Sequence, residues 1–119
     1  MGPTISKMSE VTQSHAGIYQ AQFEPSWFKG PGACGGLVFA ALARTFQEAQ
    51  GHQERSLRSL SVQLCAPAPA TPLSIEVETV RSGKRICHMR ALMKSETETI
   101  AIASAVMGSD RPTSYDFNT

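Results

Sequence analysis

An excess of charge of one sign is what this sequence lacks most clearly. Its 119 residues include 11 Lys and Arg against 10 Asp and Glu, which gives a formal net charge of +1. Non-specific binding to nucleic acid or to an anionic membrane depends on a strongly positive field. Neither class of partner is therefore expected.

Cysteine is also scarce. The three residues Cys34, Cys65 and Cys87 are odd in number and widely spaced, which favours reduced thiols over a disulfide framework. They form no C-x-x-C pair of the kind that holds a structural zinc ion. We expect no metal site.

Long hydrophobic runs are missing as well. The longest uncharged stretch, residues 30 to 43, is interrupted by four glycines and a proline, and it falls short of the ~20 apolar residues of a membrane span. Residues 1 to 14 lack the apolar core of a secretory signal, and no lipidation motif closes the sequence. We expect no membrane association and a cytoplasmic location.

The residues that are present suffice for one folded domain. Apolar residues make up 41% and charged residues 18%, unlike the apolar-poor composition of disordered chains. A chain of this length has room for one hydrophobic core and not for two. We predict a domain at residues 17–109, between a flexible leader at 1–16 and a flexible tail at 110–119.

The most informative segment is a glycine-rich loop followed by a run of helix formers. The run predicts one helix from Gly36 to Ala49, which stops before Gly51. Every residue from Leu37 to Ala43 is apolar, whereas a surface helix has a polar back. We therefore expect this half of the helix to be surrounded by protein.

Strands are predicted on both sides of this helix. Alternating apolar and polar residues mark strands with one buried face, and short connections require antiparallel pairing. The order of elements predicts an α+β fold, in which a curved antiparallel sheet of about five strands wraps one long buried helix. The predicted strands are residues 18–23, 59–64, 73–78, 86–94 and 99–108.

The last predicted strand is apolar at nearly every position, so we place it inside the sheet. Ala101, Ala103 and Ala105 alternate along it and share one face. Such small side chains would let a helix lie close to the sheet.

The glycines between residues 30 and 36 have two interpretations. Unpaired amides at a helix start can stabilise a developing oxyanion or bind a phosphate. Alternatively, the glycines only permit a tight turn and close packing. We favour the functional interpretation, because a buried helix has no other reason to start in so open a loop.

A nominal dinucleotide-binding fingerprint falls in the same segment. Gly30, Gly32 and Gly35 satisfy G-x-G-x-x-G, and Glu54 follows about twenty residues later. That fingerprint requires a parallel βαβ unit, whereas this sequence predicts one long helix and an antiparallel sheet. We reject a nucleotide cofactor on this basis.

Four motifs together resemble the hotdog-fold proteins, and in particular the acyl-CoA thioesterase II group. They are the helix start GACGGLVFAALARTF, the strand SLRSLSVQLCAPAP that ends in prolines, the strand and turn IEVETVRSGKR, and the final VMG. The resemblance covers residues 18 to 108, and it depends on the pattern of elements rather than on any one motif.

The resemblance implies a substrate and an assembly. The substrate would be an acyl thioester of coenzyme A or acyl carrier protein, with no further cofactor. The protein would be a homo-oligomer, a dimer or tetramer, in which sheets join edge to edge and the active sites lie at the dimer interface. The amides of Gly35 and Gly36 would polarise the thioester carbonyl, while a carboxylate activates water or attacks.

The sequence also departs from the family pattern. Cys34 stands where many relatives have a histidine before the two glycines, and Glu48 is the first acid on the helix. Members of the thioesterase II group usually carry two hotdog units in one chain, with the catalytic polar residues in the second. The expected function is an acyl-CoA thioesterase; the alternative is a non-catalytic acyl-thioester-binding module or the structural partner of a catalytic unit.

Further candidate residues flank the glycines. Glu24 could act as general base, or it could simply end a strand with the proline beside it. Trp27 and Phe28 could line an acyl or pantetheine channel, or pack over the helix end. Cys34 could be a low-pKa nucleophile with a histidine such as His88 brought near, although a small residue at a turn is the more common case.

Four basic residues could contact the phosphates of coenzyme A. The alternative is a solvated rim of charge at the end of a hairpin, which is the more common situation. The residues are Lys29, Arg81, Lys84 and Arg85.

Overall fold

Residues 12–24, 33–51 and 55–109 are described by the structure, which is a computed structural model. They form one helix and six strands. The elements are β1 (Thr12–His15), β2 (Ile18–Ala21), α2 (Ala33–Gln50), β3 (Arg55–Leu64), β4 (Leu73–Ser82), β5 (Ile86–Lys94) and β6 (Thr99–Ser109).

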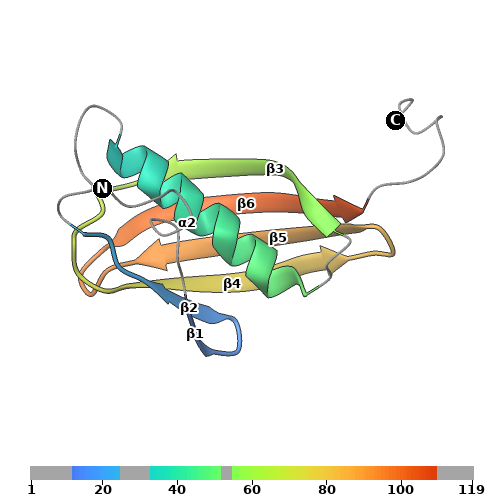
Figure 1. The fold of residues 1–119 in the computed structure, drawn as a ribbon, viewed down its shortest axis with the longest axis horizontal. Helices are drawn as coiled ribbons and strands as arrows, with labels where there is room; N and C mark the ends of the chain where they lie inside the picture. Colours follow the sequence, from blue (N-terminus) through green and yellow to red (C-terminus); the bar gives the residue numbers. More distant parts are fainter. Residues whose placement is uncertain (1–11, 25–32, 52–54, 110–119) are drawn as a thin grey trace, which may run out of the picture.

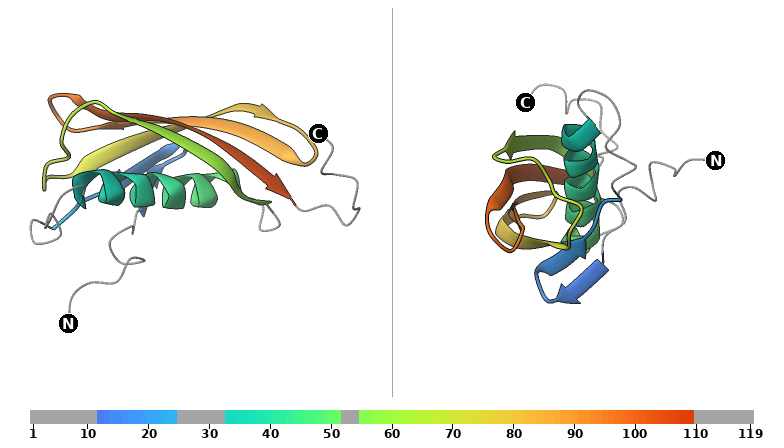
Figure 2. Two further views of the ribbon diagram at one scale, coloured as in Figure 1. Left: turned by 90° about the horizontal axis from the view of Figure 1, so that it is seen from above. Right: turned by 90° about the vertical axis from the view of Figure 1, so that its left-hand side faces the viewer.

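All six strands belong to one antiparallel sheet in the order β1-β2-β4-β5-β6-β3. The sheet is curved, and α2 lies along its concave face (Figures 1 and 2). This arrangement confirms the predicted α+β hotdog architecture. It also confirms that the last strand lies inside the sheet, since β6 pairs with β5 on one side and with β3 on the other.

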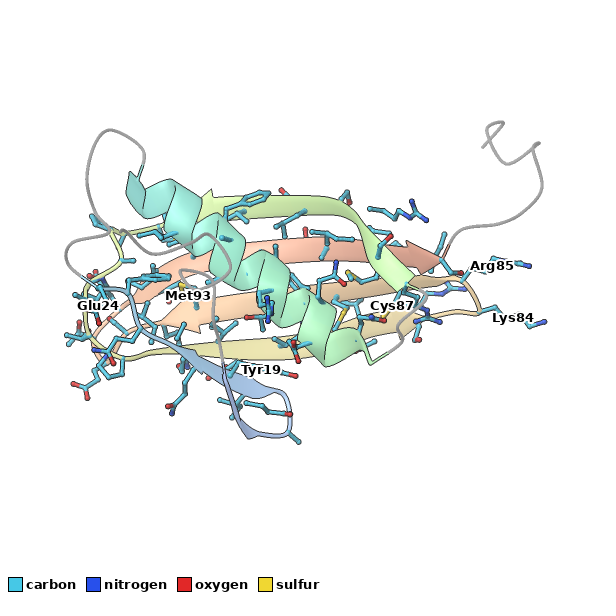
Figure 3. All side chains as sticks on the ribbon, in the orientation of Figure 1. Tyr19, Glu24, Lys84, Arg85, Cys87 and Met93 are labelled. Atoms are coloured by element: carbon cyan, nitrogen blue, oxygen red, sulfur yellow. The ribbon has the colours of Figure 1, made fainter. Side chains whose placement is uncertain are left out.

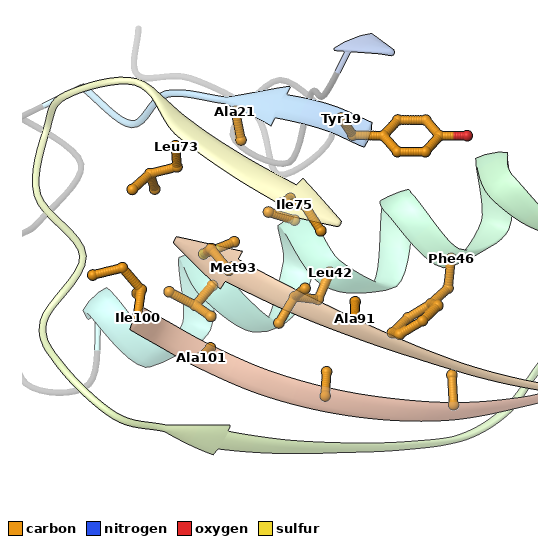
Figure 4. Packing of buried hydrophobic residues seen from close by; sticks show 14 of the residues in the cluster. Tyr19, Ala21, Leu42, Phe46, Leu73, Ile75, Ala91, Met93, Ile100 and Ala101 are labelled. Carbon is orange, nitrogen blue, oxygen red and sulfur yellow. The ribbon is translucent and has the colours of Figure 1, made fainter. Parts of the chain in front are cut away.

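Small side chains form the floor of the concave face beneath the helix. Ala101, Ala103 and Ala105 of β6 are each no more than 3% exposed. Because an alanine rises little above the sheet, α2 can approach closely and fill the space with its own larger residues. Figure 4 shows Leu42 and Phe46 of the helix directed toward this floor, and both are fully buried.

The helix differs from the prediction in two respects. It begins at Ala33, three residues before Gly36, so that the glycine pair lies within its first turn. Phe39 is 47% exposed, so the described residues do not surround the helix as its composition suggested. The number of apolar residues on a helix indicates how much apolar surface must be buried. It does not indicate whether residues of the same chain bury that surface.

The sheet also begins earlier than predicted. β1 lies inside the predicted leader, and its residues, TQSH, are all polar, so no hydrophobic alternation marked it as a strand. A hairpin turn through Gly17, which has a φ of +77°, returns the chain into β2. The N–H of Val77 donates to the Gly17 carbonyl at 2.8 Å and ties this turn to β4. The predicted tail lies outside the described residues.

Enlarging the floor of the concave face is expected to destabilise the protein. Ala103→Leu inserts three carbon atoms between β6 and α2, and overpacking of this kind costs about 1–3 kcal/mol in free energy of unfolding. Ser104→Leu is the matched control, because Ser104 is the next residue on the same strand and is exposed on the opposite face. Urea denaturation measures both; equal stability of the two variants would contradict close packing of the helix on β6.

Candidate functional site

The first turn of α2 holds the glycine pair on which the predicted site is centred. Gly35 and Gly36 are the third and fourth residues of the helix. N–H groups at the start of an α-helix have no acceptor within the helix. The Gly35 amide belongs to this free set and the Gly36 amide lies at its edge, so both positions present backbone to whatever approaches the helix start.

The described backbone does not itself require glycine at either position. Among the described residues, the glycines with positive φ are Gly17 and Gly51, not Gly35 or Gly36. A Cβ atom built on either member of the pair meets no described atom within 4 Å. Among the described residues, neither a tight turn nor close packing accounts for the pair, and no described atom occupies the space beside their Cβ positions.

The electrostatics of the helix favour an anion at this end. No acidic residue lies in the first turn of α2. Glu48, the first acid along the helix, is about 22 Å away along the axis and forms an ion pair with Arg44 at 3.5 Å. The partial positive charge of the helix N-terminus is thus not offset by a carboxylate of the helix itself.

Glu24 is brought to the same end of the molecule. β2 has already ended at Ala21, so Glu24 lies in the segment beyond the strand and is exposed. Figure 3 shows its side chain at the end of the molecule where α2 begins. The carboxylate and the first turn of α2 therefore lie at the same end of the molecule.

Several predicted residues cannot be placed. Trp27, Phe28 and Lys29 lie outside the described residues. Cys34 is the second residue of α2, and only its backbone is described. Their roles in lining the site or acting as a nucleophile stay predictions.

The structure separates His88 from the helix start. Cys87 is buried against the concave face, and its neighbour His88 is exposed on the convex face of β5. A histidine on the convex face cannot serve as base for a thiol at the start of a helix that lies in the concave face. Within one unit, this placement argues against activation of Cys34 by His88.

The structure contains two hollows that the sequence does not reveal, because each is lined by segments distant in sequence. One of about 600 Å³ lies on the convex face, where Ile18, Leu92 and Ile102 contribute apolar side chains. Another of about 250 Å³ lies near the last turn of α2 and includes Tyr19. Burial raises the pKa of Tyr19 above its usual value, and the negative charge of Glu48 adds to the shift. Neither hollow includes the glycine pair.

The described part of the chain offers no metal site and no membrane span. No group of three or more His, Cys, Asp and Glu residues gathers there as ligands for a metal ion. Within the same residues, no helix combines the length and the hydropathy needed to cross a bilayer.

Solved structures confirm the fold. A hot dog fold protein of unknown function from Alicyclobacillus acidocaldarius superimposes with a TM-score of 0.75 at 23% identity, over 96% of this chain and 42% of that one. Acyl-CoA thioesterase II TesB2 from Mycobacterium marinum gives 0.69 at 19%, over 93% and 41%. A hypothetical thioesterase from Streptococcus pneumoniae TIGR4, solved with coenzyme A, gives 0.71 at 18%, over 88% of each chain.

The chain spans about two-fifths of the length of the thioesterase II structure and of the Alicyclobacillus protein. No curated protein matches the sequence. A family model does: the acyl-CoA thioesterase N-terminal domain matches residues 23–108, which include the glycine pair, α2 and the sheet from β3 to β6. The chain therefore belongs to the acyl-CoA thioesterase N-terminal domain family.

Proposed function

We propose that this chain is the thioester-binding unit of an acyl-CoA thioesterase, with the substrate carbonyl at the start of α2. The observation that carries the proposal is the glycine pair in the first turn of α2. Backbone N–H groups there are free at the positive end of the helix, and no described atom lies within 4 Å of a Cβ built on either glycine. The family match supports a thioester substrate. Acyl-CoA and an acyl thioester of carrier protein present the same reacting group to this site.

The proposed chemistry is hydrolysis through a tetrahedral oxyanion. Water attacks the thioester carbonyl carbon, and the carbonyl oxygen becomes an oxyanion beside the amides of Gly35 and Gly36. Glu24 accepts a proton from the attacking water. The carbon–sulfur bond then breaks, and the proton passes to the departing thiolate, which leaves a carboxylic acid and a free thiol.

We further propose that two units complete each site. β3 lies at the edge of the sheet and pairs with β6 on one side only in the described chain, which leaves ten residues of strand edge for a second unit. The half-exposed Phe39 gives the outer side of α2 apolar surface that a second unit could cover. The second unit is another copy of this chain in a dimer or tetramer.

A binding module that does not hydrolyse is the second candidate. It is favoured by one observation: within α2 the first carboxylate is Glu48, far from the helix start, so the helix itself offers no acid to activate water. In that case the chain would bind acyl thioesters or support a catalytic unit. Hydrolysis of a panel of acyl-CoA thioesters by the purified protein, followed by chromatography, separates the two functions.

Removing one amide tests the oxyanion role. Gly35→Pro deletes the free N–H in the first helical turn, where proline is tolerated, and should lower kcat for acyl-CoA hydrolysis about 100-fold or more. Gly35→Ala keeps the N–H and adds a Cβ in open space, so it is the matched control. Equal activity of the two variants, both folded by circular dichroism, would remove Gly35 from the mechanism.

Glu24→Gln tests the general base. The loss of proton transfer should lower kcat about 100-fold with little change in KM, because the side chain acts on water rather than on bound substrate. Glu96→Gln is the control, since Glu96 is an exposed carboxylate in the β5–β6 turn. If both substitutions leave kcat unchanged, another residue activates the water.

The edge of β3 is tested by molecular mass. Light scattering should give at least twice 12.8 kDa for the protein. Ser61→Glu on β3 should shift it toward the monomer, because two-fold pairing brings like charges close. Ser104→Glu changes the register partner of Ser61 on β6, inside the sheet, and should leave the mass unchanged. A wild-type monomer, or equal effects of both substitutions, would refute pairing through β3.

A further inference from the structure

Within residues 35–43 of α2, Phe39 is the one large side chain that the described residues leave uncovered. It is 47% exposed, whereas Leu37, Val38 and Leu42 are each at most 5% exposed. Single exposed apolar residues are common on protein surfaces, so exposure by itself assigns no role to Phe39. The position of Phe39 relative to the glycine pair does assign one.

Phe39 follows Gly35 by four residues and Gly36 by three. Residues three and four apart lie on the same face of a helix, with their Cβ positions about 5–6 Å apart. Helical side chains lean toward the N-terminus, so each one covers surface over the turn before its own Cα atom. The ring of Phe39 is thus carried toward the turn that holds the glycine pair.

The ring borders the space beside the glycine pair without filling it. A Cβ atom built on Gly35 or Gly36 would have no described atom within 4 Å, and the side chain of Phe39 is among the described atoms. The described residues therefore leave room for a bound group between the amides of the first turn and the ring. No side chain in residues 35–43 is polar, so this part of the helix offers such a group apolar contact.

The two flanks of α2 face opposite edges of the sheet. Burial raises the pKa of Tyr19 on β2, and the nearby charge of Glu48 raises it further, so Glu48 lies on the flank toward β2. Phe39 precedes Glu48 by about two and a half turns at 3.6 residues per turn, so it lies on the opposite flank. That flank faces β3, beside which α2 begins (Figure 1).

The flank toward β3 is also the side at which the proposed second unit joins. A group held between Phe39 and that unit would be enclosed from both sides. A thioester has two arms beyond its carbonyl. The pantetheine arm carries two amides that need hydrogen-bond partners, which the side chains of residues 35–43 do not supply, whereas a saturated acyl chain needs only apolar contact. The acyl arm is therefore the one that fits the ring.

We propose that Phe39 is a specificity-determining residue, whose ring packs against the first carbons of the acyl chain while the thioester carbonyl lies at the glycine pair. The site then prefers a linear chain long enough to reach the ring over an acetyl group, whose methyl carbon ends before it. This inference rests on the proposed function, because it takes the start of α2 as the position of the carbonyl.

The first test compares chain-length selectivity. Wild-type protein and Phe39→Ala are assayed by chromatography with hexanoyl-CoA and acetyl-CoA, and the readout is the ratio of the two kcat/KM values. Loss of the ring should lower the hexanoyl-to-acetyl ratio about tenfold or more, because even one methylene in an apolar pocket is worth about tenfold. Phe39→Leu keeps an apolar side chain of smaller reach and should give an intermediate ratio.

Ile102→Ala is the matched control. Ile102 is also 47% exposed, but it lies on the convex face of β6, away from α2. Its removal should leave the selectivity ratio unchanged. Three results would overturn the proposal: an unchanged ratio in Phe39→Ala, an equal fall of kcat/KM for both substrates in that variant, and an equal change of the ratio in Ile102→Ala. The second result would assign the ring to the pantetheine arm or to the structure of the helix.

A binding test separates the failure of this inference from that of the proposed function. S-hexyl-CoA and S-ethyl-CoA are thioethers that cannot be hydrolysed, and isothermal titration calorimetry gives their Kd values. Phe39→Ala should raise the Kd of S-hexyl-CoA about tenfold and leave that of S-ethyl-CoA unchanged. Hydrolysis with unaltered selectivity in the variant would reject only the role of Phe39. Length-dependent binding through Phe39 without hydrolysis would reject only the enzyme. A wild-type protein that neither binds nor hydrolyses these compounds would overturn both.

Molecular mass separates a contact with substrate from a contact with the second unit. Light scattering should give the same mass for wild-type protein and Phe39→Ala, both folded by circular dichroism, since the β3 edge rather than the ring joins the units. A lower mass together with an equal loss of activity on both substrates would place Phe39 in the interface between units and contradict its role in selectivity.

Discussion

The packing of α2 into the concave face of the sheet is the contact on which the rest of the structure depends. The alanines of β6 lower the middle of the sheet, and Leu42 and Phe46 of the helix fill the space above them. Apolar burial of this kind is the main favourable term in folding, and here most of it lies in one interface. Because the helix is held along its length, its first turn has a defined position at one end of the sheet, and the amides of that turn can be presented as a fixed group.

That constraint separates, along a single helix, the residues that pack on the sheet from the glycine pair of the proposed site. Leu37 and Val38 are buried and hold the helix to the sheet. By contrast, a Cβ atom built on either glycine immediately before them would meet no described atom within 4 Å. The described residues place no packing demand on the pair, which is compatible with its proposed role in binding. The same separation holds across the sheet, whose concave face is apolar and whose convex face carries the ion pairs of β4 and β5.

The net charge of the protein is small, but its basic and acidic residues are separated along the long axis. The buried Arg55 fixes the turn that carries Lys84 and Arg85, and the acidic β5–β6 turn lies at the other end. Two such units placed side by side in opposite directions would bring unlike ends together. The proposed pairing through β3 would therefore be favoured by this separation of charge, although the overall charge is close to zero.

The sequence by itself determined the class of fold, the identity of the buried helix and the inner position of the last strand, because hydrophobic period and connection length are local properties that survive in the printed residues. It also singled out Gly35 and Gly36. It did not reveal β1, whose four polar residues show no hydrophobic alternation and pair with β2, nor the exposed side of α2 at Phe39. Only the tertiary structure placed His88 on the convex face, put Glu24 at the end of the molecule where α2 begins, and joined Arg55 to the β4–β5 turn. Strand order and sheet curvature, not distance in the sequence, set each of these relations.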